Sequence, residues 1–114
     1  METSFWITGH RHLGELVIAL TILLALYASF SRKTPARGLR MAVVGLLDLQ
    51  VLWGVVMMVV LKLPLTPFVL HPALMILAAV VAHLAARSPK PVPLLWGAVA
   101  LLLAGFAAIE VVLR

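Results

Sequence analysis

Four histidines are the residues of this chain that could do the most specific chemistry, and three of them stand at the heads of apolar segments. His10 and His12 precede the first apolar run, and His71 lies near the start of the third. Two imidazoles on facing helices, at one depth in a bundle, can supply both axial ligands of a haem iron. The pattern predicts haem b bound by His71 and by either His12 or His10.

Charged residues near these histidines suggest supporting roles. Glu15 follows His12 by three residues, so on a helix its carboxylate can accept a hydrogen bond from the imidazole of His12 and orient the ring. His10 does not have this spacing, which favours His12 slightly and leaves both open. Arg11 or Lys62 would pair with the haem propionates at the outer surface. The plainer alternative is that His10 and His12 are solvated residues at a membrane border.

A second set of polar residues interrupts the later apolar runs: Asp48, Gln50 and His83. A carboxylate inside a membrane must be protonated, paired or hydrated. Asp48 is therefore expected either to hydrogen-bond between helices together with Gln50 or to handle protons, whereas His83 is expected to bond a backbone carbonyl. His83 follows His71 by twelve residues, a rotation of about 120° around a helix. A second haem stacked between the same two helices is not expected.

Composition identifies the elements that must position these side chains. The chain has 114 residues, of which 64% are hydrophobic and 11% charged, against about 25% charged in soluble domains. The apolar residues form four runs close to the ~20 residues that a membrane helix needs, too long for barrel strands. The chain has no cysteine, which excludes disulfides and thiolate metal sites. We therefore expect an all-α integral membrane protein in which the net charge of +5 faces lipid headgroups and not nucleic acid.

The expected architecture is a single domain, residues 1–114, with a polar lead and four spans. A helix beginning at Gly9 or His10, capped by Thr8, would follow the lead. The spans are expected at about residues 12–30, 41–61, 68–86 and 94–113. The connections between them are short and contain prolines, so consecutive helices must lie antiparallel. This predicts an up-down four-helix bundle.

Basic residues predict how the bundle sits in the membrane. The first and third connections carry six of them: Arg32, Lys33, Arg37, Arg40, Arg87 and Lys90. The opposite side has three: Arg11, Lys62 and Arg114. Because loops rich in lysine and arginine stay in the cytoplasm, both termini are expected on the outer side of a bacterial inner membrane.

Several of these residues lie in segments that resemble a known family. The histidines before the first span, the segment Asp48–Gly54 (DLQVLWG) and the segment His71–Met75 (HPALM) are similar to those of small bacterial four-span membrane proteins labelled cytochrome b-like. Leu70 departs from that pattern, in which an acidic residue precedes the histidine. The resemblance implies haem binding by residues of the first and third spans. A weaker likeness is to one half of a haem A synthase, a four-helix unit with histidines on alternate spans.

The sequence leads to a principal interpretation and two alternatives. The principal one is a b-type-cytochrome-like membrane protein that transfers electrons to a redox partner. The first alternative is a cofactor-free accessory subunit of a larger membrane complex. The second is a homo-oligomer that handles protons or solutes through Asp48, Gln50 and His83. The sequence has no catalytic triad, phosphate-binding glycine loop or zinc-binding helix motif, so we do not expect the chain to be an enzyme by itself.

Overall fold

The computed structural model describes residues 3–64 and 69–113, which form four helices. Their bounds are α1 Thr3–Ser31, α2 Arg37–Val60, α4 Leu70–Arg87 and α5 Val92–Leu113. Each is long and apolar enough to cross a membrane. This confirms the predicted all-helical, membrane-span-like architecture. The predicted start of the third span, residue 68, lies outside the described residues.

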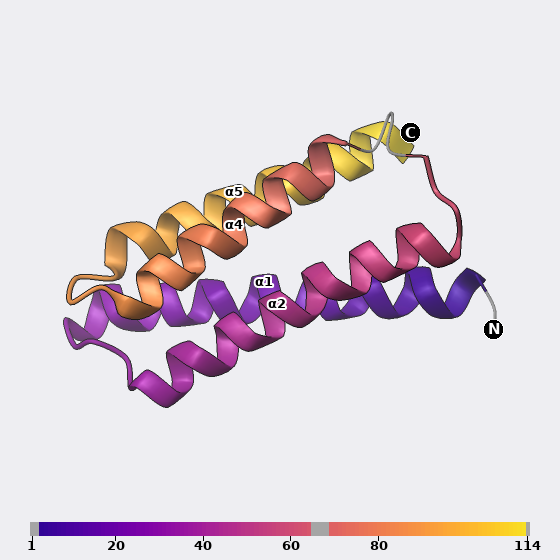
Figure 1. The fold of residues 1–114 in the computed structure, drawn as a ribbon. Coiled ribbons are helices and arrows are strands. Elements are labelled where there is room, and N and C mark those ends of the chain that lie inside the picture. Colours follow the sequence, from indigo (N-terminus) through magenta and orange to yellow (C-terminus); the bar gives the residue numbers. More distant parts are fainter. Residues whose placement is uncertain (1–2, 65–68, 114) are drawn as a thin grey trace.

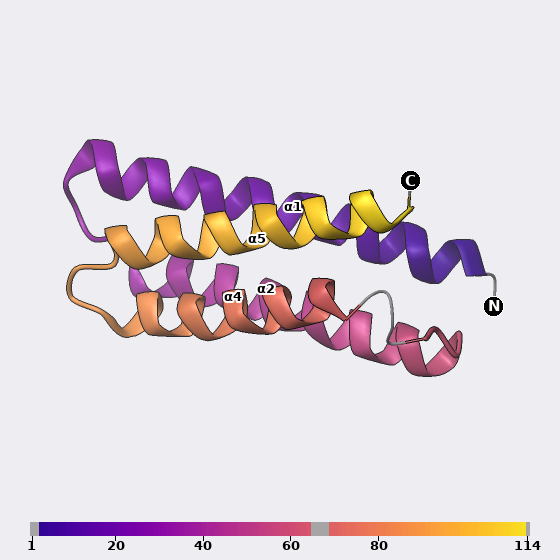
Figure 2. The ribbon, with the colours of Figure 1, turned by 90° about the horizontal axis from the view of Figure 1, so that it is seen from above.

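The helices run up and down in a ring (Figures 1 and 2). α1 packs against α2 and α5, and α4 packs against the same two neighbours. Over the described residues, the backbones of the diagonal pairs α1–α4 and α2–α5 do not come close to one another. The start of α1 and the end of α5 lie at one end of the bundle, which we call the terminal end. Residues 32–36 and 88–91 connect helices at the other, the loop end (Figure 1). Side chains of α1 and α4 can therefore meet only across the bundle axis.

The polar lead differs from the prediction, because α1 already begins at Thr3 and Thr8 lies inside it. Tertiary contacts with α2 account for the difference. The indole of Trp53 donates a hydrogen bond to the backbone oxygen of Trp6 over 3.0 Å, and the rings of Phe5 and Trp53 lie 5.8 Å apart. The indole also lies so close to Gly9 that a Cβ there would collide with it. Side chains from α2 thus hold the lead in helical form.

Small side chains bring α4 and α5 together in the most extensive helix contact of the bundle. α4 buries alanines at 78, 82, 85 and 86, which pack against Leu102, Val99 and Ala98 of α5. Lipid tails are as apolar as leucine, so membrane helices associate through close van der Waals packing, and small residues permit it. The alanines therefore account for the tightness of this pair.

Replacing Ala78 by leucine should destabilise the bundle. Ala78 is fully buried in a core cluster that includes Leu47, Met75 and Leu102, and extra methyl groups in a packed core force neighbouring side chains apart. We expect the free energy of unfolding to fall by about 1–3 kcal/mol, measured by unfolding in mixed detergent and sodium dodecyl sulfate. Ala73→Leu, at an exposed position of the same helix, is the control and should change stability little.

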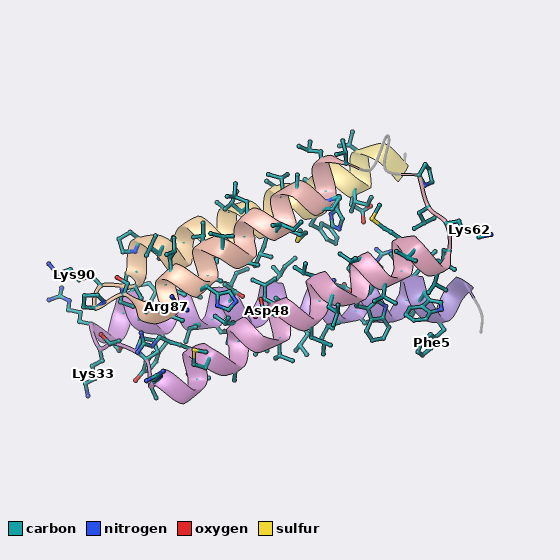
Figure 3. The ribbon with its side chains drawn as sticks, viewed as in Figure 1. Phe5, Lys33, Asp48, Lys62, Arg87 and Lys90 are labelled. Carbon is teal, nitrogen blue, oxygen red and sulfur yellow. The ribbon has the colours of Figure 1, made fainter. Side chains whose placement is uncertain are left out.

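Polar contacts fasten the loop end. Arg40 of α2 donates from Nη1 to the carbonyl oxygen of Ala86 over 2.8 Å, which satisfies a carbonyl in the last turn of α4. Trp96 of α5 donates from its indole nitrogen to Ser29 Oγ over 2.9 Å. Lys33, Arg87 and Lys90 gather around this end, whereas Lys62 lies at the terminal end (Figure 3). The loop end is therefore the basic end of the molecule.

Candidate functional site

Two histidines meet across the bundle axis in its terminal half. His10 comes from α1 and His71 from α4, diagonal helices whose backbones do not approach each other closely. Their ring centroids are 6.1 Å apart and the ring planes are nearly perpendicular, at 86°. Both residues are partly buried. The fold thus brings two imidazoles from opposite corners into the bundle interior.

A backbone carbonyl fixes the tautomer of His71. Its Nδ1 lies 2.9 Å from the carbonyl oxygen of Gly105 on α5. A carbonyl can only accept, so Nδ1 carries the proton and donates. The remaining nitrogen, Nε2, keeps its lone pair and is the atom that can bind a metal ion. The Gly105 carbonyl therefore orients the His71 ring and leaves its Nε2 without a proton.

Gln50 of α2 bonds the backbone of His10, and one side-chain atom of each of these two residues has no hydrogen-bond partner among the described residues. Its amide nitrogen donates to the backbone oxygen of His10 over 2.7 Å and lies 3.5 Å from His10 Nε2. Among the described residues, His10 Nδ1 and Gln50 Oε1 are buried without a hydrogen-bond partner. Buried polar atoms in folded proteins nearly always have partners. These two atoms therefore leave part of the hydrogen-bonding capacity of the site unsatisfied among the described residues.

Glycines make the space that these side chains occupy. A Cβ at Gly54 would lie 3.0 Å from Cε1 of His10, and one at Gly14 would lie 2.7 Å from the amide nitrogen of Gln50. The sequence suggests only helix packing for Gly54 and Gly105. In the structure one glycine lies against the first imidazole and the other supplies the carbonyl for the second.

His12, which the sequence favours slightly over His10, lies elsewhere. Its Nδ1 is 3.3 Å from the Glu15 carboxylate, and both side chains are more than half exposed. The expected pair of His12 and Glu15 thus forms, but it lies on the outside of the bundle and not beside His71. Two residues turn a helix by about 200°, so a helix that points His10 inward points His12 outward. Arg11 pairs instead with Glu110 of α5, over 3.9 Å.

Asp48 and His83 form a separate polar pair in the loop half of the bundle. His83 Nε2 lies 2.8 Å and 3.0 Å from the two oxygens of the Asp48 carboxylate, linking α4 to α2. The His83 side chain is 42% exposed and that of Asp48 is 46% exposed. Figure 3 shows Asp48 near the middle of α2. Gln50 is buried on another face, so Asp48 lies with His83 and not with Gln50, and the partner of His83 is a carboxylate instead of a backbone carbonyl.

The paired histidines suit a metal group that needs only two protein ligands. Among the residues that the structure describes, no three histidine, aspartate or glutamate side chains converge as a metal cage. A haem brings its own four equatorial nitrogens and takes two axial ligands from the protein. The free Nε2 of His71 and the imidazole of His10 opposite it are the two protein ligands that such a group would need.

Comparison with known proteins adds no family assignment to this geometry. No protein-family model, curated protein or solved structure matches the chain.

Proposed function

We propose that this chain is a small b-type cytochrome, in which His10 and His71 bind one haem b between α1 and α4. The single observation that carries the proposal is the approach of the two imidazoles across the bundle axis, 6.1 Å between ring centroids. Bundle proteins commonly build cofactor sites from side chains on facing helices. When bound, the haem supplies a one-electron site that cycles between ferrous and ferric iron.

The residues of the chain then have distinct tasks. Gly105 holds the His71 ring and keeps its proton on Nδ1. Gln50 fixes the backbone of His10 through its amide. Arg11 lies one residue beyond His10, mostly exposed and in a loose pair with Glu110, which suits it to neutralise a propionate at the membrane border. Glu15 and His12 lie on the outside of the bundle and are not among the residues proposed to bind the haem.

The proposed setting is a bacterial inner membrane with both termini outside. The gathering of basic residues at the loop end supports this orientation, because such residues favour the cytoplasmic side. The haem would then lie in the outer half of the bilayer. An electron carrier in that position exchanges electrons with a redox partner at the outer surface or within a larger membrane complex.

The test is a dithionite-reduced minus oxidised absorption spectrum of detergent-purified protein, expressed with a supply of haem. We expect a b-type α-band in the native chain, and its loss in His71→Ala and in His10→Ala. His12→Ala is the matched control, because it removes a histidine from the same helix two residues away. It should keep the band and the haem-to-protein ratio.

Other outcomes would redirect the assignment. A colourless native protein would contradict haem binding and favour the cofactor-free accessory subunit, whose companions would co-purify. A band that survives His10→Ala and disappears in His12→Ala would assign the second ligand to His12. A band that survives His71→Ala would exclude the proposed site altogether.

A further inference from the structure

The Asp48–His83 pair lies in an unfavourable place for a monomer in a membrane. Both residues belong to helices long enough to span the bilayer, and both side chains are nearly half exposed on the outside of the bundle. Ionisable side chains in membrane segments are costly and face protein or water, not lipid tails. In a lone bundle this pair would face hydrocarbon. Its position therefore indicates that something polar covers it.

Asp48 sits in an exposed stripe along α2, and His83 reaches it from α4. Members of the stripe recur at alternating intervals of four and three residues, the spacing of one helix face that packs on another helix. They are Met41, Gly45, Asp48, Leu52, Val55 and Val59. Gly45, one turn before Asp48, has no atom of the bundle within 4 Å of where a Cβ would stand. It makes no packing contribution inside the bundle, and it would allow a second helix to approach closely.

The hydrogen-bonding groups of the pair are complementary to themselves. His83 uses Nε2 to bond Asp48, and no described residue bonds its Nδ1. A carboxylate has about four lone-pair sites, so Asp48 can accept a further hydrogen bond. One copy of the pair thus offers a donor and an acceptor, which is what another copy of the same pair requires.

We propose that this stripe is the interface of a homodimer, in which His83 of each copy, protonated on both ring nitrogens, bonds its own Asp48 through Nε2 and donates through Nδ1 to Asp48 of the other copy. Copies inserted in one orientation can be related by a twofold axis only if that axis runs along the membrane normal. The axis places identical residues opposite one another at equal depth, as an isologous interface requires. The four side chains would close a ring of hydrogen bonds sealed from lipid. The proposal does not depend on haem binding.

Cysteine cross-linking tests the interface directly, because the chain has no cysteine of its own. Leu52→Cys introduces a thiol one turn from Asp48 in the stripe, and mild oxidation in native membranes should give a disulfide-linked dimer. Leu103→Cys is the control, since Leu103 is similarly exposed on α5, the helix diagonal to α2. It should remain monomeric. Equal cross-linking of both variants, or none in Leu52→Cys, would overturn the proposal, and the latter would point to a different protein as the cover.

A second set of variants tests the contacts themselves. Gly45→Leu and the double change Asp48→Leu with His83→Leu should each lower cross-linking of Leu52→Cys about tenfold or more, because they block close approach or remove the hydrogen bonds. Circular dichroism should show unchanged helix content, since Gly45 has open space around it. Undiminished cross-linking in both variants would contradict the proposed contacts.

Discussion

Replacing Gly54 by leucine is expected to abolish haem binding while the four helices stay folded. The Cβ of any larger residue at this position would lie 3.0 Å from Cε1 of His10, and the leucine methyl groups would extend further into the volume of the ring. The imidazole would have to leave its position opposite His71. If His10 and His71 hold the iron as proposed, displacing one of them should remove the b-type α-band almost completely.

Gly45→Leu is the matched control for this prediction. Both glycines lie on α2, and both substitutions raise intrinsic helix propensity by the same amount, roughly 1 kcal/mol. Only Gly54 faces a histidine, whereas the space around Gly45 is open. Gly45→Leu should therefore keep the haem and lose the dimer, and Gly54→Leu should lose the haem and keep the dimer. A Gly54→Leu protein with a normal haem-to-protein ratio would contradict the role of His10.

The four helices could be predicted from the sequence because hydrocarbon thickness sets the length of an apolar run. The start of α1 could not be predicted in the same way. Its first turns are held by Trp53 of α2, whose indole bonds the backbone of Trp6 and covers Gly9. Such contacts depend on the tertiary arrangement, and the polar residues of the lead indicate a coil when read alone.

For the candidate site, the depth of each histidine along its helix could be predicted from the sequence. The direction in which its side chain points around the helix could not. The positions of His71 and of the first two histidines along their helices placed them at the same end of the bundle. The choice between His10 and His12 depends on how α1 is turned about its axis, which the packing of the whole helix decides. Glu15, three residues after His12, favours His12 in the sequence, but this pair forms equally well when both side chains lie on the outside of the bundle. Gly105 contributes a backbone carbonyl, which no side-chain pattern can reveal.

The helix α2 serves two polar centres with two faces. Gln50 turns inward to His10, and Asp48 turns outward to His83. Two residues rotate a helix by about 200°, so a joint role for Asp48 and Gln50 was already improbable from their spacing. Their opposite directions would allow one span to line the proposed cofactor site with one face and the proposed dimer interface with the other. Variants at each centre should therefore act independently.

Asp48 and His83 are expected to be strongly non-additive in a double-mutant cycle. Asp48→Leu leaves an imidazole without its acceptor, and His83→Leu leaves a carboxylate without its donor, so each single change should destabilise the bundle. The double change removes both polar groups and should recover much of the loss, as when apolar residues replace a buried ion pair in a protein core. We expect a coupling energy of about 1–2 kcal/mol, measured by unfolding in mixed detergent.

The double-mutant cycle should be measured in a variant that does not dimerise, and its coupling energy should be compared with that of a second charged pair. In Gly45→Leu protein, which the proposed interface excludes from dimerising, the coupling reports the bond within one copy alone. Arg11 and Glu110 provide the comparison, because their ion pair is longer, 3.9 Å, and lies at the terminal end of the bundle. Exposed pairs of that kind couple by about 0–1 kcal/mol. Equal coupling in the two cycles would mean that Asp48 and His83 are solvated like surface residues, and the argument that a second copy must cover them would lose its basis.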